Sequence, residues 1–337
     1  MKKQSNFELL RIISMILIVL HHFGVHTPWK YYIGFNSQKF LIQIFSIGGK
    51  IGVNCFVLIT AYFLSQRTTI SSSLKRTWQI TSFYSILITI LLGLFFGNIP
   101  RIEILKGFIP VITNQYWFVT SYIILLFFVP LLNVAVNNLG HTEYKRLLIT
   151  LFTFLSVLSS IPGIEAFTNS IIWFIFLFLI GAYIRLFCKE NIQRKTIFLG
   201  TLSSLILLII TLIGLDILSG KYSFFYNKEL SIVKNNQNFL LLIISIGLFL
   251  LFKDYKMKYN FIINKIASTM FSVYLIHDNP LIRVFYWKNV LRYIDPSSSV
   301  SILFFGVCSS LLILIVSILI DIFRQELFTK ISGLIKK

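Results

Sequence analysis

Residues 7–26, FELLRIISMILIVLHHFGVH, form the stretch that decides the fold of this chain, because an apolar run of this length can span a membrane. Arg11 and His22 lie eleven positions apart within it. In a helix their side chains are about 20° apart around the axis and about 16 Å apart along it. A charge in the middle of a bilayer costs from about 3 to more than 10 kcal/mol unless it faces protein or water. We therefore expect both residues to face a common site inside a membrane protein.

The composition also indicates a membrane protein. Hydrophobic residues make up 56% of the 337 residues and charged residues only 13%, whereas a typical soluble domain is about 25% charged. The mean hydropathy is +0.81. Apolar runs recur along the chain, and we predict an all-α, polytopic membrane protein with about ten transmembrane helices, at residues 7–25, 40–64, 78–97, 116–134, 147–161, 169–187, 197–218, 238–252, 266–285 and 299–320.

Basic side chains are distributed unevenly between the predicted loops, and this distribution predicts the orientation. With the N-terminus inside, the cytosolic segments contain nineteen Lys and Arg residues and the outer segments nine. Under the positive-inside rule, this bias places both termini in the cytosol. Topology thus explains the net charge of +19. Nucleic-acid binding is not indicated, because the charges form no single basic face.

The sequence gives no sign of division into domains. No linker rich in Pro, Gly or Ser interrupts it, so we expect a single integral-membrane domain over residues 1–337. A cleaved signal peptide is disfavoured for residues 1–26, because no small-residue cleavage site follows the apolar run. Cys55, Cys188 and Cys308 are isolated in apolar sequence without metal-ligand spacing. We expect these cysteines to be packing residues, and we expect no metal site.

The first apolar run carries side chains suited to acid–base chemistry. Glu8 lies three residues before Arg11, so the two can pair across one helical turn. His21 and His22 follow near the predicted outer end, where a neutral imidazole can take a proton from a hydroxyl group. Arginine stays charged and suits a phosphate or an oxyanion. The alternative is structural, a helix-packing ion pair with both histidines at the membrane interface. The helical angle favours His22 over His21 as the reacting residue.

Later segments add polar residues that are candidates for binding. Asn54 lies within the second apolar run and needs an internal partner. Lys75 and Arg76 lie in a cytosolic stretch, where they either follow the positive-inside rule or hold the phosphates of an anionic cofactor. Trp117 is one of many outer aromatic residues, which form either an interfacial belt or a platform for a sugar. His277 lies in a late predicted span. An ionisable side chain inside a membrane costs free energy, so its presence there suggests a function.

Together these segments resemble the acyltransferase 3 family of integral membrane acyltransferases. That family opens with an acidic residue, an arginine three positions later, then ten residues and a histidine, a pattern similar to Glu8, Arg11 and His22. Further similarities follow in the family's order: Gly52, Val53, Phe56, Thr60, Ala61 and Tyr62; Lys75, Arg76 and Tyr84; Trp117, Phe118 and Pro130; Phe178, Gly181 and Ala182; and Tyr274, Leu275, Ile276 and His277. The chain departs from the family where Val57 replaces a phenylalanine, where Thr-Ala replaces Ser-Gly, and where Phe83 replaces a proline.

The resemblance extends over residues 8–277 and implies a bacterial plasma-membrane enzyme. It implies that acetyl-CoA, or another short acyl-CoA, is the co-substrate, and that a cell-surface polysaccharide or lipid-linked glycan accepts the acyl group. His22 would be the general base or a transient acyl carrier, with Glu8 orienting Arg11 against the thioester oxyanion or a CoA phosphate. The remaining candidates form a cofactor-binding group and an acceptor-binding group: Lys75, Arg76 and Tyr84, and Asn54, Trp117 and His277.

Some members of that family carry an SGNH-type domain for the final transfer, whereas this sequence continues for 17 residues beyond the last predicted span. The resemblance therefore implies direct transfer or a separate extracytoplasmic transferase as partner.

Two other functions fit a polytopic chain. A transporter or flippase for a lipid-linked saccharide would use intramembrane charges as a relay and consume no acetyl-CoA. A glycan polymerase normally needs a large outer loop, and the longest predicted outer segment, 219–237, is modest. Release of CoA would distinguish the acyltransferase from the transporter.

Overall fold

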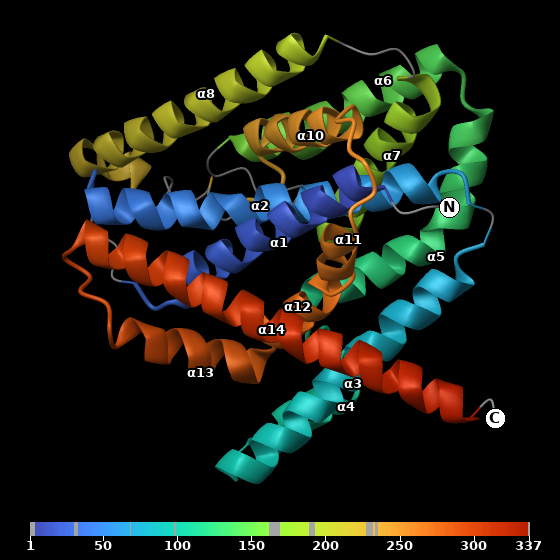
Figure 1. The fold of residues 1–337 in the computed structure, drawn as a ribbon. Coiled ribbons are helices and arrows are strands. Elements are labelled where there is room, and N and C mark those ends of the chain that lie inside the picture. Colours follow the sequence, from blue (N-terminus) through green and yellow to red (C-terminus); the bar gives the residue numbers. More distant parts are fainter. Residues whose placement is uncertain are drawn as a thin grey trace.

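Helices are the regular elements in every part of the chain that the computed structural model describes, which is residues 4–29, 33–67, 69–97, 99–161, 169–188, 193–226, 232 and 235–335 (Figure 1). This confirms the predicted all-α fold. The longer helices are α1 (Ser5–His26), α2 (Ser37–Leu64), α3 (Ser71–Phe96), α5 (Trp117–Asn138), α7 (Ser170–Phe187), α8 (Arg194–Lys221) and α14 (Ser299–Ile335). The shorter elements are α4 (Arg101–Phe108), α6 (His141–Phe152), η1 (Thr153–Val157), η2 (Leu158–Ser160), η3 (Ser223–Phe225), α10 (Phe239–Lys253), α11 (Phe261–Ala267), α12 (Met270–His277) and α13 (Pro280–Leu291).

Seven of the described helices are long and apolar enough to cross a membrane, namely α1, α2, α3, α5, α7, α8 and α14. They confirm the polytopic character of the chain. The predicted runs 147–161 and 238–252 correspond to shorter elements, which are α6 with η1 and η2 in the first case and α10 in the second. The count of ten spans and the cytosolic termini stay predictions.

The predicted span at 266–285 is wrong as a single helix, because the structure divides this run among α11, α12 and α13. The side chain of Asn279 caps α13 by accepting a hydrogen bond from the amide of Leu281. Pro280 is the first residue of that helix, a position at which the missing amide hydrogen of proline costs nothing. The Asn-Pro pair therefore starts a new helix rather than bending an old one. Asp278 consequently lies at a helix junction.

Helices α1 and α2 pack side by side at the centre of the molecule (Figure 1). Glycines in α2 set their spacing: a Cβ atom at Gly52 would lie 2.9 Å from the side chain of Ile18, and one at Gly49 would collide with the ring of His21. Small residues allow such close approach between membrane helices. Helix α2 also contacts α7 and α10, while α14 contacts α1 and α12. The first two helices thus form the frame on which the others are placed.

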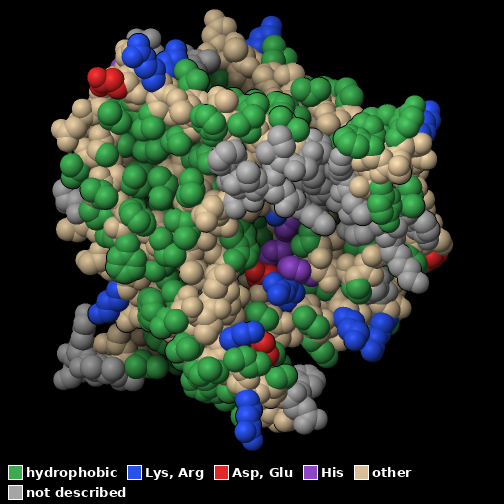
Figure 2. All heavy atoms as spheres, turned by 180° about the vertical axis from the view of Figure 1, so that it is seen from behind, with side chains coloured by type: hydrophobic (Ala, Val, Ile, Leu, Met, Phe, Trp, Pro, Cys, Tyr) green, Lys and Arg blue, Asp and Glu red, His purple; other side chains and the backbone are tan. Residues whose placement is uncertain are grey.

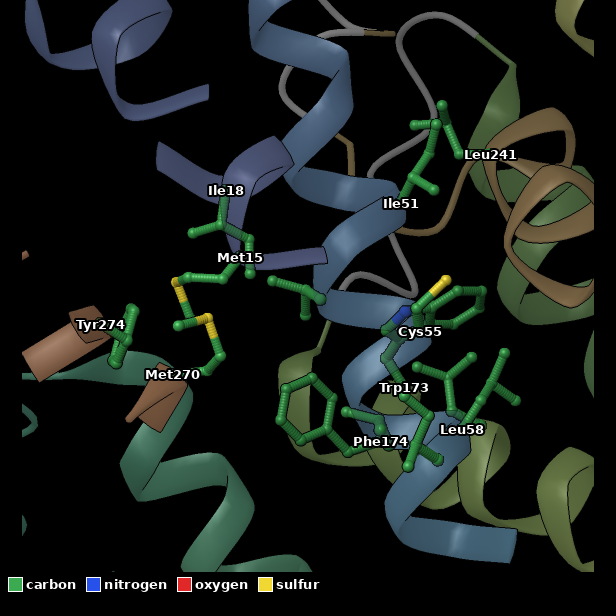
Figure 3. Packing of buried hydrophobic residues seen from close by; sticks show 14 of the residues in the cluster. Met15, Ile18, Ile51, Cys55, Leu58, Trp173, Phe174, Leu241, Met270 and Tyr274 are labelled. Carbon is green, nitrogen blue, oxygen red and sulfur yellow. The ribbon is translucent and has the colours of Figure 1, made fainter. Parts of the chain in front are cut away.

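Buried apolar side chains fill the space around this frame. Met15 of α1 and Met270 of α12 lie next to each other, and Cys55 of α2 lies near Trp173 of α7 (Figure 3). The exposed fraction of Cys55 is 1%, as expected for a packing residue. The packing role expected for Cys308 is wrong within this chain, because that side chain is exposed on α14.

A buried ion pair joins α2 to α8. The ammonium group of Lys39 lies 2.8 Å from Oδ1 of Asp216, and the two side chains are 1% and 0% exposed. Gln43 donates a hydrogen bond of 3.1 Å to the same oxygen. A pair this deeply buried is costly to break, because removal of one partner leaves the other charge uncompensated. The ion pair therefore holds α8 against the frame.

Candidate active site

A cavity of about 320 Å³ lies beside the C-terminal part of α1. Figure 2 shows histidine side chains inside a hollow of the surface, next to basic and acidic side chains. We name it the histidine cavity; its histidine and charged lining residues are His21, His22, His26, Lys50, Asp278 and Arg283. Aromatic side chains complete its walls, among them Trp117. The cavity therefore combines titratable groups with surfaces that suit a sugar ring.

A second cavity, of about 300 Å³, lies beside the N-terminal part of α1. We name it the arginine cavity; its charged lining residues are Glu8, Arg11 and Arg76. A guanidinium nitrogen of Arg11 donates to both carboxylate oxygens of Glu8, at 3.0 and 3.2 Å. This confirms the predicted pairing across one helical turn. Arg76, from α3, has no hydrogen-bond or acidic partner within the described ranges, so its guanidinium is available to an anion.

Three phenylalanine side chains line both cavities: Phe56 of α2, Phe118 of α5 and Phe271 of α12. We name them the phenylalanine partition. Arg11 lies on one side of this partition and His22 on the other. The two residues thus face adjoining cavities that share three aromatic rings, and one site that includes both residues stays a prediction.

Hydrogen bonds behind His22 fix its protonation pattern. Nδ1 of His277 lies 2.6 Å from the carbonyl oxygen of Val273, which can only accept, so this nitrogen carries a proton. In the neutral ring, Nε2 of His277 is then an acceptor, and it lies 2.8 Å from Nδ1 of His22. Nδ1 of His22 must therefore be the donor. The free lone pair of a neutral His22 is thus on Nε2, as a general base requires.

Asp278 lies at the centre of a cluster of basic groups. Its Oδ1 atom is 3.6 Å from Nδ1 of His22, 3.4 Å from Nε2 of His26 and 3.3 Å from a guanidinium nitrogen of Arg283. The carboxylate is 3% exposed. A buried negative charge beside the protonated nitrogen of a base stabilises the cation that forms when the base takes a proton. Asp278 is therefore placed to support His22.

The same cluster has the geometry of a possible metal site. Ligand atoms of His22, His26 and Asp278 all lie within 4.8 Å of one another. Two contacts favour an acid–base role instead. Nδ1 of His22 already pairs with His277, and the guanidinium of Arg283 already neutralises Asp278. A metal ion bound here would have to displace His277 from Nδ1 of His22, and the positive charge of Arg283 would repel it.

His21 also lines the histidine cavity, but its surroundings differ from those of His22. Its Nδ1 atom donates a hydrogen bond to the carbonyl oxygen of Ser46, and its ring packs against Gly49. No carboxylate of the described residues lies within ion-pair distance of this ring. The structure thus gives His22, rather than His21, the partners of an activated base.

The predicted cofactor-binding residues separate in the structure. Arg76 lines the arginine cavity beside Arg11. Lys75, its neighbour, lines a different hollow with Trp78. Tyr84 is buried and donates a hydrogen bond of 2.6 Å to Asp321 of α14. Tyr84 therefore joins two helices and lines neither cavity.

The predicted acceptor-binding residues also separate. Trp117 lines the histidine cavity. His277 is 1% exposed and contacts His22 from behind. Asn54 is fully buried and accepts a hydrogen bond of 2.9 Å from the indole of Trp173. Of these three residues, the geometry makes Trp117 the one that a substrate could touch.

Sequence reasoning gave no role to four residues of the histidine cavity, each of which carried a signal. His26 lies one helical turn after His22, on the same face. Lys50 interrupts the middle of an apolar run, and Arg283 lies within another. Asp278 directly follows His277. The signal common to these four residues is therefore a titratable or charged side chain within or next to an apolar run.

Comparison with known proteins identifies the family of the chain. A search of curated proteins found no match, and a search of solved structures found none either. A family model described as an acyltransferase domain matches residues 4–321, which include every residue of both cavities. The chain therefore belongs to the acyltransferase 3 family, and the protein is a membrane acyltransferase.

Proposed function

We propose that the protein is an O-acetyltransferase that moves an acetyl group from cytosolic acetyl-CoA to a hydroxyl group of a cell-surface or lipid-linked glycan. One observation carries this proposal: a cavity lined by two arginines and a cavity lined by His22 and Asp278 adjoin each other across three aromatic rings. A two-substrate transfer needs both kinds of cavity, with a short path between them.

The arginine cavity suits the phosphates of the donor. Arg11 and Arg76 both line it, and planar guanidinium groups bind phosphate with two parallel hydrogen bonds. Glu8 holds Arg11 in place. Because Arg11 faces the cavity opposite to His22, its position supports the phosphate role over the oxyanion role. The pantetheine arm, a long flexible chain, would then extend past the phenylalanine partition toward His22.

Chemistry in the histidine cavity follows from the free lone pair of His22. Nε2 takes the proton of the acceptor hydroxyl as the hydroxyl oxygen attacks the thioester carbonyl carbon. The C–S bond of the tetrahedral intermediate then breaks, and the leaving thiolate takes the proton from the imidazolium. Asp278 stabilises the imidazolium between these two steps, while His277 keeps the ring oriented. Transfer is direct in this scheme, without an acyl-histidine.

The phenylalanine partition protects the donor. A thioester that reaches the histidine cavity between Phe56, Phe118 and Phe271 is surrounded by apolar rings on its donor side. Such rings exclude water, which would otherwise compete with the acceptor hydroxyl. The partition therefore favours transfer over hydrolysis.

Acetylation of surface glycans in cells tests the function. Cells that produce His22→Ala or Arg11→Ala protein at the normal level should lose acetyl esters from their surface glycan, measured by mass spectrometry. His141→Ala and Arg101→Ala are matched controls, because these residues line neither cavity. Wild-type acetylation in both active-site variants would reject the proposal. Translocation of a saccharide without release of CoA would favour a transporter instead.

A further inference from the structure

Lys50 is a basic side chain in the middle of a membrane-spanning helix. It is the fourteenth of the 28 residues of α2, so about 20 Å of helix separates it from either end. A lysine stem is too short to carry its ammonium group to the membrane surface over that distance. A charge at such depth needs a partner or a polar cavity. Lys50 lines the histidine cavity, which provides that surrounding.

Lys50 has no ion-pair or hydrogen-bond partner in the described part of the chain. Asp278, the acidic lining residue, already pairs with Arg283 at 3.3 Å. With the histidines neutral, the described lining residues therefore leave one positive charge in excess. In a cavity that water enters only in part, such an excess attracts an anion more strongly than it would at an open surface.

We propose that the histidine cavity recognises an acceptor glycan that carries a negatively charged group, a carboxylate or a phosphate, bound by Lys50 and Arg283. This inference rests on the proposed function, because it names the acceptor class for the same site. The ammonium group offers three donors, and the guanidinium retains donors that Asp278 does not use. Trp117 lines the same cavity and offers an aromatic face to the sugar ring. A charged acceptor would thus be fixed with one hydroxyl group at Nε2 of His22.

The negative charges of the donor do not account for Lys50. Donor phosphates have their own place beside Arg11 and Arg76, and the phenylalanine partition separates that place from Lys50. Pantetheine and the acetyl group, the parts of the donor that reach the histidine cavity, carry no charge. An anion beside Lys50 therefore belongs to the acceptor.

The charge preference of the enzyme tests this inference. Purified protein in lipid vesicles is given acetyl-CoA and surface glycan from cells that lack the protein, in three portions: untreated, amidated to neutralise carboxylates, and treated to remove phosphates. The preference is kcat/KM on the untreated portion divided by kcat/KM on each treated portion. Wild-type protein should prefer the untreated portion to one treated portion by about tenfold or more, the size expected of a charge-assisted hydrogen bond. Lys50→Gln should bring this ratio close to one, and Lys50→Arg should restore most of it.

Several outcomes would overturn the inference. Equal kcat/KM on all three portions would do so, as would a full preference in Lys50→Gln. A raised KM for acetyl-CoA in Lys50→Gln, with the charge preference intact, would place Lys50 on the donor and also overturn it. Lys106→Gln is the matched control and should keep the wild-type ratio, because Lys106 pairs with Glu103 at 2.7 Å and lines neither cavity. If the proposed function itself fails, wild-type protein releases no CoA with untreated glycan, and both proposals fall.

Discussion

The two cavities contain similar sets of charged groups, but they differ in the side chains that can transfer a proton. Each contains one carboxylate paired with an arginine, and each contains a further cation without an acidic partner in the described ranges, Arg76 in one and Lys50 in the other. Imidazole rings line only the histidine cavity, as far as the structure describes its walls. Under the proposed function, charge would explain binding in both cavities, whereas the proton-transfer step would occur only in the histidine cavity.

Removal of the base should have the largest effect. In His22→Ala, we expect kcat to fall by about a hundredfold to ten-thousandfold, the usual contribution of a general base. The affinity for acetyl-CoA should stay close to wild type, because the arginine cavity is intact. Steady-state CoA release gives the first quantity, and equilibrium binding of acetyl-CoA gives the second. Loss of both CoA release and acetyl-CoA binding would contradict the assignment of proton transfer to one cavity and donor binding to the other.

Removal of the unpaired cation of the arginine cavity should change the KM for acetyl-CoA more than kcat, the reverse of what we expect for His22→Ala. In Arg76→Met, the KM for acetyl-CoA should rise by about tenfold, since a charge-assisted hydrogen bond to phosphate is lost. A smaller change in kcat is expected. Lys75→Met is the matched control, because Lys75 is adjacent in sequence but lines a separate hollow. If Lys75→Met raised the KM as much as Arg76→Met, donor binding would depend on the overall positive charge of this region and not on the arginine cavity.

Loss of the residue behind the base should have an intermediate effect on kcat. His277→Phe removes the acceptor at 2.8 Å from Nδ1 of His22, so the ring of His22 loses its fixed orientation. We expect kcat to fall by about tenfold, with the KM for acetyl-CoA unchanged. His277→Gln should recover part of the rate, because its amide oxygen can accept the same proton. An equal loss in both variants, with a lower melting temperature, would indicate a packing role alone.

Metal chelation should have the smallest effect. A metal ion could be surrounded by His22, His26 and Asp278. However, the carboxylate of Asp278 already forms an ion pair with Arg283. We therefore expect EDTA to leave the rate of CoA release within about twofold of the untreated rate, a difference of less than about 0.5 kcal/mol in the activation barrier. Inactivation by EDTA that zinc reverses would contradict the acid–base assignment and make this cluster a metal centre.

Features set by local helical geometry could be predicted from the sequence. The pairing of Glu8 with Arg11, and the burial of His22 on the interior face of α1, follow from the helical repeat. The break beside Asp278 could not be placed from hydropathy, because the apolar run continues across it. Hydropathy measures how apolar a segment is, and the break depends instead on capping by Asn279.

Other features depend on packing between distant segments. His277 meets His22 across 255 residues of sequence, because α12 packs against α1. Lys75 and Arg76 are equivalent by charge, yet their side chains diverge by about 100° around α3. Only the positions of the neighbouring helices decide which of them faces the cavity. The sequence therefore predicts the residue types of the site better than their partners.

Under the proposed function, Phe56, Phe118 and Phe271 would also act as a seal. If both termini are cytosolic, as the sequence predicts, the arginine cavity faces the cytosol and the histidine cavity faces the exterior, so that these rings separate the two compartments. Phenyl rings hold no proton and coordinate no ion, and a narrow apolar constriction resists wetting. Under the proposed function, an acetyl group would therefore leave the cytosol at this point while the electrochemical gradient of the membrane is maintained.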